Sequence, residues 1–218
     1  MIRVKDLRKA YGDVVAVDGV SLDVPDGCRL GIVGPSGSGK TTLLRLIAGL
    51  EAPDAGSIHI DGRCASAPGR LLEPHRRGIG FVFQRPALWP HLTVAQNVRF
   101  GLGRLGRDEA ARRVGRLLEA MGIEGLADRR PAALSEGQAR RVAIARALAP
   151  EPAHLLMDEP LTNLDADLKG RLVRLIQSAV ADRGATLIYV SHDAGEVADL
   201  AERVVRLVGG RLEAEDGG

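Results

Sequence analysis

The sequence predicts an α/β fold built on a parallel sheet, and two observations carry this prediction. The short apolar run RLGIVG at 29–34 enters a glycine-rich loop and is followed at once by a segment with helical spacing. Apolar runs of strand length return at 154–158, 186–191 and 203–208, with stretches of helical spacing between them. Strands that alternate with helices in this way favour a parallel sheet with helical crossovers.

The first sixty residues predict an antiparallel region around the first strand of this core. Residues 14–27 and 56–62 alternate apolar and polar side chains between Gly, Pro and Asp, which is typical of antiparallel strands joined by turns. The segment TTLLRLIAGL at 41–50 has apolar residues at helical spacing, and Gly49 marks its end. We therefore expect antiparallel strands on both sides of a strand–loop–helix unit.

A helical segment is expected in the middle of the chain. The run IGFVF at 79–83 predicts one more buried strand, after which the chain changes character. Two amphipathic stretches, 107–123 and 135–149, dominate the part that follows and predict helices. We expect a single domain over 1–218, with a helical subdomain at 86–150 inserted into a core formed by 1–85 and 151–218.

The composition is that of a globular protein with a full core. Hydrophobic residues make up 45% of the 218 residues, and the formal net charge of +2 gives no indication of a nucleic-acid partner. Cys28 and Cys64 lack the spacing of a metal site or a disulfide framework. No run approaches the roughly 20 apolar residues of a membrane span, and the first residues lack a signal-peptide core. We therefore expect a soluble, cytosolic chain.

The stretch GPSGSGKT at 34–41 carries the strongest chemical signal. It matches the phosphate-loop pattern G-x-x-x-x-G-K-[ST] and lies between a predicted strand and a predicted helix, as the motif requires. Glycines let backbone N–H groups turn toward phosphates, Lys40 supplies a positive charge, and the Thr41 hydroxyl can coordinate Mg²⁺. The sequence has no N-K-x-D motif, which argues against a GTPase. We expect nucleotide binding at Gly34, Pro35, Ser36, Gly37, Ser38, Gly39, Lys40, Thr41 and Thr42.

Two acidic residues end a predicted buried strand downstream of this loop. LLMDE at 155–159 places Asp158 and Glu159 at the carboxyl end of the strand, where ligands collect in open α/β sheets. Asp158 is therefore a candidate for the Mg²⁺ shell, and Glu159 is a candidate for the general base that polarises the attacking water. The alternative is a strand that ends in two solvated acids before Pro160.

A second Ser/Gly cluster, LSEGQ at 134–138, precedes the last helix of the central segment. As local structure it is a capping box, in which Ser135 caps the helix and Gln138 reaches back to the cap. An apolar stripe follows at Val142, Ala145 and Leu148–Ala149. The capping box does not explain why this cluster stands between a phosphate loop and a pair of acids.

Further motifs complete a series along the chain: Tyr11 in KAYG, GPSGSGKT, Gln84 in FVFQ, LSEGQ, LLMDEP, LTNLDADL at 161–168 and His192 in YVSHD. This order resembles that of the ATP-binding cassette (ABC) family of ATPases, whose signature is LSGGQ, over essentially the whole chain. The resemblance implies a P-loop NTPase of ABC type, with a RecA-like parallel-sheet core, an N-terminal antiparallel β subdomain and a helical subdomain. It also implies ATP hydrolysis with ATP and Mg²⁺ as ligands.

In this family two cassettes face head to tail, and each signature closes over the ATP held by the other cassette's phosphate loop. The resemblance implies that Ser135, Gly137 and Gln138 bind nucleotide in trans, and that Asp165 in the TNLD segment links the two sites. Hydrolysis would then require a dimer, and a homodimer is expected. Glu136 stands where the family usually has glycine, and we expect its side chain to point outward.

Three further residues take their roles from the same resemblance. Tyr11 matches the aromatic residue that stacks on adenine, and Gln84 matches the residue that contacts Mg²⁺ or the attacking water. His192 matches the switch histidine that contacts the terminal phosphate, so Glu159, His192 and Gln84 form the expected catalytic set. Taken alone, Tyr11 would be a core aromatic residue, Gln84 a strand-end amide and His192 a structural histidine.

The loop RPALWPHLTVAQNVRFGL at 85–102 carries the only Trp of the sequence. Packing of the loop itself would explain it, but the resemblance implies contact with two transmembrane permease subunits. The loop resembles those of importers for ions or small organic solutes, which also use an extracytoplasmic solute-binding protein. We expect a peripheral cassette on the cytoplasmic face of the cell membrane. Because the sequence ends shortly after His192, we expect no C-terminal regulatory domain.

Two other functions fit parts of the sequence. A non-transport ABC ATPase that acts as a mechanical or regulatory switch shares every motif, but this sequence lacks the coiled coils, zinc modules or tandem cassettes of such proteins. A single-site kinase shares the phosphate loop, but LSEGQ and His192 argue against it. Separate chains would select the transported solute.

Overall fold

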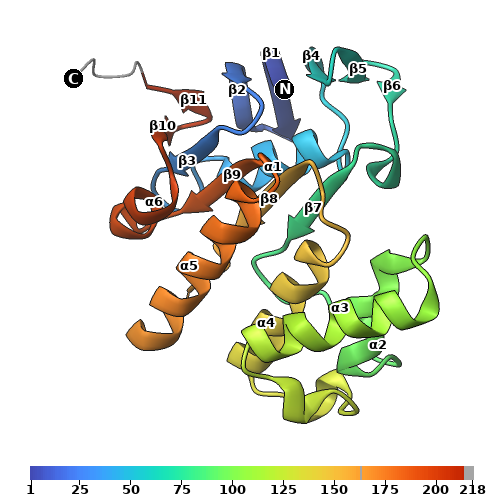
Figure 1. The fold of residues 1–218 in the computed structure, drawn as a ribbon. Coiled ribbons are helices and arrows are strands. Elements are labelled where there is room, and N and C mark those ends of the chain that lie inside the picture. Colours follow the sequence, from blue (N-terminus) through green and yellow to red (C-terminus); the bar gives the residue numbers. More distant parts are fainter. Residues whose placement is uncertain (163, 214–218) are drawn as a thin grey trace. The chain divides into compact units, whose positions relative to one another are not determined.

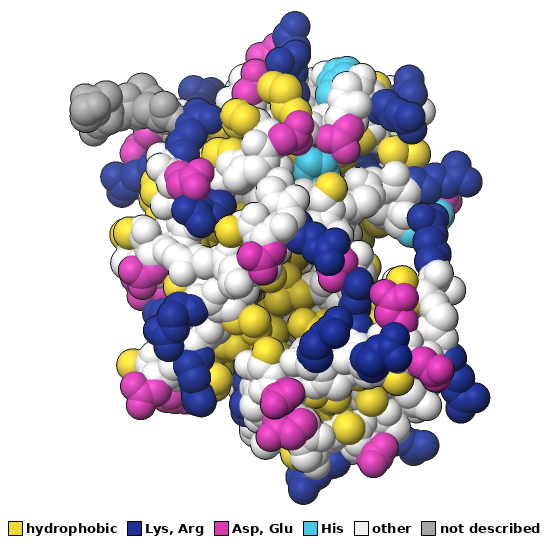
Figure 2. All heavy atoms as spheres, viewed as in Figure 1, with side chains coloured by type: hydrophobic (Ala, Val, Ile, Leu, Met, Phe, Trp, Pro, Cys, Tyr) yellow, Lys and Arg dark blue, Asp and Glu magenta, His cyan; other side chains and the backbone are white. Residues whose placement is uncertain are grey.

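The computed structural model describes residues 1–162 and 164–213, which fall into two compact units (Figure 1). The first comprises Met1–Ile79, Ala153–Glu159 and the described residues from Val180 onward, and the second comprises Gly80–Pro152 and Pro160–Ala179. Asn163, part of the TNLD segment, and the C-terminal residues 214–218 lie outside the described residues. Basic and acidic side chains are interspersed over the face drawn in Figure 2, in keeping with the net charge of +2.

An antiparallel sheet forms the N-terminal part of the first unit. Its strands follow the order β2-β1-β4-β5-β6. The sequence did not predict β1 as a separate strand, because a bulge at Asp6, with a φ of 46°, breaks its alternation between Val4 and Leu7. The strands are β1 (Ile2–Tyr11), β2 (Val14–Val24), β4 (Ala55–Ile60), β5 (Arg63–Ala67) and β6 (Arg70–Leu71).

A mostly parallel sheet forms the centre of the same unit, so the predicted parallel α/β core is confirmed. Its strands follow the order β11-β10-β3-β9-β8 within this unit, and all neighbours from β10 to β8 are parallel. The strands β8 and β9 are buried along their whole length, which explains their continuous apolar runs. The strands are β3 (Arg29–Val33), β8 (His154–Asp158), β9 (Thr186–Ser191), β10 (Arg203–Val208) and β11 (Arg211–Leu212).

Two helices of this unit follow strands of the parallel sheet. Helix α1 (Lys40–Ala48) comes after β3, packs against β8 and ends at Gly49, as the sequence predicts. Helix α6 (Ala194–Leu200) comes after β9 and packs against both β9 and β3. The two helices therefore hold the chain segments that lie at the carboxyl ends of β3 and β9.

A buried arginine fixes the end of α1. Arg77 is 3% exposed and follows a 3₁₀ turn at Pro74–Arg76. Gly49, which has a φ of 78°, leaves room for the guanidinium, because a Cβ at this position would overlap it. Burial lowers the pKa of Arg77 to about 10. The guanidinium donates to backbone carbonyls of α1, of β5 and of the residue after β6: Leu46, Ile47, Ala65 and Leu72.

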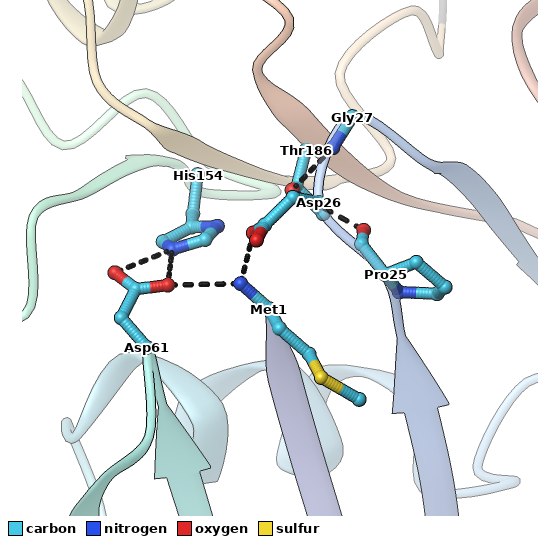
Figure 3. Close-up of polar contacts among 7 residues, drawn as sticks. All are labelled: Met1, Pro25, Asp26, Gly27, Asp61, His154 and Thr186. Carbon is cyan, nitrogen blue, oxygen red and sulfur yellow. Dashed lines mark hydrogen bonds and ion pairs between the residues drawn. The ribbon is translucent and has the colours of Figure 1, made fainter.

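A polar cluster lies where β1, β4 and β8 begin or end (Figure 3). The Met1 ammonium contacts the carboxylates of Asp26 and Asp61, at 2.8 Å from the latter. The buried His154 places Nε2 3.1 Å from both carboxylate oxygens of Asp61. Because Asp61 follows β4 and His154 begins β8, their contact ties the antiparallel sheet to the start of β8.

The second unit is helical, and none of the helices within residues 1–162 and 164–213 is long and apolar enough to cross a bilayer. Helix α4 is buried at four consecutive positions, Val142 to Ala145, because it packs against both α2 and α3. The helix predicted at 135–149 is therefore confirmed, and Val142 and Ala145 of its apolar stripe are buried, but the predicted one-sided amphipathic pattern is wrong. Strand β7 (Ile79–Val82) leads into the unit from the first. Its helices are α2 (Val94–Arg99), α3 (Arg107–Ala120), α4 (Glu136–Leu148) and most of α5 (Ala166–Ala181), with 3₁₀ turns at Phe100–Leu102, Glu124–Leu126 and Pro131–Ala133.

Candidate nucleotide site

The phosphate loop lies between β3 and α1 in the first unit, as predicted. Gly37 and Gly39 have φ values of 77° and 102°, a region that strains any other residue. A Cβ at Gly39 would also overlap the carbonyl oxygen of Ala16, and one at Gly34 would overlap that of Leu207. Conformation and space therefore both require the glycines of this loop.

The side chain of Lys40 points back into the loop. Lys40 is the first residue of α1 and is only 6% exposed. Its ammonium donates to the carbonyl oxygens of Gly34 at 2.7 Å and Pro35 at 2.9 Å. Burial lowers the pKa of Lys40, while the charges of Glu159 and Asp158 act in the opposite direction. A buried positive charge thus lies where the loop would hold phosphates.

Thr41 and Asp158 bring two oxygen donors together next to the loop. Thr41 Oγ1 donates to Asp158 Oδ1 at 3.1 Å. Asp158 is the last residue of β8 and is 2% exposed, and this burial raises the pKa of its carboxyl. A hydroxyl and a buried carboxylate are the kind of hard oxygen ligands that Mg²⁺ prefers. The residues present therefore fit a magnesium ion.

Glu159 and His192 form a second pair beside this one. Glu159 has a φ of 47°, which is rare for a residue other than glycine, and its amide donates to the carbonyl of Val190 at 2.9 Å. Its Oε1 lies 3.2 Å from Nδ1 of His192. The Glu159 side chain is 14% exposed, and that of His192 is 52% exposed. A carboxylate held by an imidazole near a phosphate loop could accept a proton from water.

Tyr11 lies at the end of β1 and is 47% exposed, so the interpretation as a core aromatic is wrong. Its hydroxyl donates to Glu51, and Thr42 and Arg45 of α1 lie close to it. Burial and then Glu51 raise the pKa of Tyr11. Lys9 Nζ lies 5.6 Å from the ring centroid. The exposed ring therefore stands next to the helix that starts at the phosphate loop.

The signature residues lie at the start of α4 in the second unit. Ser135 Oγ accepts the amide of Gln138 at 3.3 Å, and Gln138 Oε1 accepts the amide of Ser135 at 2.9 Å. This arrangement is the capping box that the sequence predicts. The Glu136 side chain is 65% exposed and pairs with Arg140 one turn along the helix at 3.1 Å. Its outward direction agrees with the expectation from the sequence.

Leu164 of the TNLD segment lies beside the signature. A Cβ at Gly137 would lie 3.4 Å from Leu164 Cδ2, and Asp165 Oδ1 accepts the amide of Leu168 at 2.9 Å at the start of α5. Gln84 is exposed just after β7. These residues belong to the second unit, whereas the phosphate loop, the two acids and His192 belong to the first.

Sequence reasoning missed one buried carboxylate near the site. Glu196 on α6 is 6% exposed and accepts hydrogen bonds from Tyr189 and Ser191, which precede His192 on β9. A single acid in a short helix is normally a surface residue, so the sequence carried no signal for it.

Fold and site together define a nucleotide-binding protein of the P-loop class. Residues 17–162 match the family described as "ABC transporter". The chain resembles, with 33% identity and a TM-score of 0.90, a dimeric post-hydrolysis structure of the ATP-binding cassette MJ0796 bound to ADP and Pi, covering 98% of this chain and 97% of that one. The chain belongs to the ABC transporter family of ATP-binding cassettes, as the order of its motifs predicts.

Curated relatives lie in the same family. The chain is 46% identical to the "Fe(3+) ions import ATP-binding protein FbpC" of Mesorhizobium japonicum, the "Sulfate/thiosulfate import ATP-binding protein CysA 1" of Chromobacterium violaceum and the "sn-glycerol-3-phosphate import ATP-binding protein UgpC" of Rhizobium meliloti. Each match covers 97% of this chain but only 59% or 60% of the relative. The chain therefore spans about three fifths of the length of these relatives.

Proposed function

We propose that this chain is the ATP-binding and ATP-hydrolysing subunit of an ABC importer. The observation that carries the proposal is the convergence, in one unit, of the phosphate loop, the Thr41–Asp158 pair and the Glu159–His192 pair. Two further findings support it: the relatives are named import ATP-binding proteins, and the similar cassette structure holds ADP and Pi.

The residues of the first unit would bind the nucleotide. The amides of the loop and the N-terminal end of α1 direct partial positive charge at the phosphates, and Lys40 adds a full charge. The exposed ring of Tyr11 would stack on adenine. A magnesium ion would be held by Thr41 and Asp158 and would supply positive charge to the phosphate oxygens. Burial disfavours the charged form of Asp158, and a bound cation would stabilise that form.

Glu159 would act as the general base. Its carboxylate accepts a proton from the attacking water while the water oxygen bonds to the terminal phosphorus and the bond to the leaving ADP oxygen breaks. His192, whose Nδ1 lies 3.2 Å from Glu159, orients this carboxylate and leaves its Nε2 for the transferred phosphoryl group. The two side chains therefore divide the tasks of moving a proton and contacting phosphate.

A second cassette would complete the site. Ser135, Gly137 and Gln138 stand at the N-terminal end of α4, which suits an anion such as the terminal phosphate held by the partner's loop. Asp165 lies in the segment next to this signature and would link the two sites. ATP occupancy would then control whether the pair of cassettes is closed.

The segment 85–102, which includes α2 and the 3₁₀ turn after it, would contact two membrane-spanning permease subunits. Trp89 and Phe100 are 44% and 62% exposed, and their ring centroids lie 5.4 Å apart. The buried side chain of Asn97 fixes the loop by hydrogen bonds with the backbone of Trp89, Leu92 and Thr93. An exposed aromatic pair on a segment held by such hydrogen bonds is typical of an interface. The cassette would thus be peripheral on the cytoplasmic face of the membrane.

A solute-binding protein outside the membrane would deliver the solute to the permease. The relatives are named for iron(III), sulfate or thiosulfate, and glycerol 3-phosphate, all at 46% identity. Overall identity therefore does not select the solute. Copurification with a permease tests the transport function against a non-transport switch.

The proposed function is tested by light scattering of Glu159→Gln with and without Mg²⁺ and ATP. We expect a monomer that becomes a dimer only with ATP and has lost hydrolysis, because the neutral amide cannot accept the proton. Glu124→Gln, which changes an exposed acid of the second unit, is the control and should behave as the unchanged protein. Hydrolysis by Glu159→Gln at the unchanged rate would remove Glu159 from the mechanism, and failure of the unchanged chain to bind ATP would refute the function.

A further inference from the structure

The carboxylate of Glu196 is buried beside the strand end that carries His192. Its Oε2 accepts hydrogen bonds from the Tyr189 hydroxyl at 3.0 Å and from Ser191 Oγ at 2.8 Å. Burial and the neighbouring Glu196 raise the pKa of Tyr189, so its hydroxyl stays protonated and remains a donor. The proposed reaction uses none of these three groups directly.

Ser191 connects Glu196 to the residue that follows His192. Its hydroxyl donates its one proton to Glu196 and accepts the amide of Asp193 at 3.1 Å. Asp193 Oδ1 in turn accepts the amides of Gly195 at 2.8 Å and Glu196 at 3.3 Å, which caps α6. The residues on both sides of His192 are therefore tied to the same helix.

Close packing fixes the position of that helix. Val197, the residue after Glu196, is fully buried against Gly31 of β3. A Cβ at Gly31 would overlap Val197 Cγ1, so the contact exists only because this position is glycine. The carboxylate of Glu196 therefore belongs to a helix that cannot move away from the sheet without losing a buried contact.

We infer that Glu196 is a positioning residue for the proposed ATPase reaction, because it fixes the backbone around His192 so that the imidazole stays directed at Glu159. The His192 side chain is 52% exposed, so packing restricts it little and its direction depends on the backbone that carries it. The path runs from Glu196 through Ser191 to the amide of Asp193. The catalytic consequence rests on the proposed function, whereas the orientation of His192 does not.

The path is tested by four substitutions: two remove a hydroxyl donor to Glu196, and two replace Glu196 itself with leucine or glutamine. Ser191→Ala breaks the connection to Asp193, whereas Tyr189→Phe leaves it intact. Long-range ¹H–¹⁵N spectra of the full chain, with His192 assigned through His192→Asn, report the ring tautomer without any need for activity. We expect Ser191→Ala and Glu196→Leu to shift the His192 ring nitrogens, and Tyr189→Phe and Glu196→Gln to leave them near their original positions. Unchanged His192 signals in a folded Ser191→Ala variant would overturn the inference.

A double-mutant cycle tests the consequence for the reaction. Ser191→Ala should lower kcat for ATP about tenfold with little change in KM, the scale expected when a reacting group is slightly misplaced. In a His192→Ala background the same substitution should have no further effect, because its influence passes through His192. Losses that multiply would overturn the inference. An unchanged chain without ATPase activity would instead refute the proposed function, and the spectra would still decide the role of Glu196.

Discussion

Thr41 Oγ1 donates a hydrogen bond to Asp158 Oδ1 across 3.1 Å, although 117 positions separate the two residues in the chain. Helix α1 and strand β8 bring them together, because the helix packs against the strand at whose end Asp158 stands. The pair joins a phosphate loop to an acidic strand end, and its two oxygen atoms are the first place to test for magnesium.

Asp158→Asn should remove the Mg²⁺ dependence of ATP binding. The amide is close to the carboxylate in shape and can still accept from Thr41, but it carries no charge for a divalent ion. Isothermal titration should give at least about tenfold weaker ATP binding with Mg²⁺, equal to about 1.4 kcal/mol, and unchanged binding without it. Asp108→Asn, at an exposed acid in the first turn of α3, is the control. A variant that still binds ATP more tightly with Mg²⁺ would contradict the assignment.

The same substitution should stabilise the chain in the absence of Mg²⁺ and nucleotide. Burial raises the pKa of Asp158, so the folded state binds this proton more tightly than the unfolded state does. The free energy of unfolding therefore falls as pH rises from the ordinary pKa of the carboxyl through its raised value, and Asp158→Asn lacks this decline. Urea denaturation between about pH 4 and about pH 8 should show a gain for the variant that grows with pH. A gain that is constant over this range would count against the raised pKa.

Arg77→Met should lower the free energy of unfolding by about 3 kcal/mol or more. The substitution removes the donor to several backbone carbonyls at the end of α1 and in β5, and each buried polar group left without a partner costs about 1–3 kcal/mol. Arg76→Met is the matched control, because its side chain is 66% exposed and its ion pair with Glu73 spans 3.6 Å. A similar loss for both variants in urea denaturation would show that Arg77 contributes no more than a surface residue.

Ser135→Asp should separate the local role of the signature from its role in trans. Aspartate is as good a helix cap as serine, so stability should change by less than about 0.5 kcal/mol. The added negative charge should abolish ATP-dependent dimerisation in a Glu159→Gln background, because it would face the phosphates held by the partner cassette. Thr93→Asp changes the other capping box of the second unit, at α2, and should leave dimerisation intact. Dimerisation that survives Ser135→Asp would restrict LSEGQ to a cap.

Glu136→Gly should strengthen ATP-dependent dimerisation. Glu136 is exposed at the first turn of α4, and a negative charge at this end opposes the approach of another cassette's ATP. Glu136→Gln removes the charge without the helix cost of glycine. When each substitution is combined with Glu159→Gln, the double variant should dimerise at a lower ATP concentration than Glu159→Gln alone. The difference should shrink as salt increases. Equal dimerisation with and without the charge would show that the ion pair with Arg140 already neutralises it.

The sequence predicted the parts of this fold and site that depend on local order. The glycines, Lys40 and Thr41 are contiguous, and β8 and β9 are continuous apolar runs, so pattern alone located them. It could not predict the burial of α4 on several sides, because that depends on the helices packed around it. The same limit applies to Glu196, because it meets Tyr189 and Ser191 only when α6 packs against β9.

Gly31 contributes no functional group, yet its lack of a side chain allows α6 to lie against β3. Saturation mutagenesis of this chain should therefore find that Gly31 tolerates few substitutions, although it takes no part in the reaction. The substitution pattern distinguishes the two kinds of intolerance. At Lys40 or Glu159 activity should track charge and hydrogen-bonding capacity, whereas at Gly31 it should fall with the volume of the new side chain whatever its polarity. In cassettes with this packing, the largest side chain tolerated at Gly31 therefore indicates the distance between the sheet and α6.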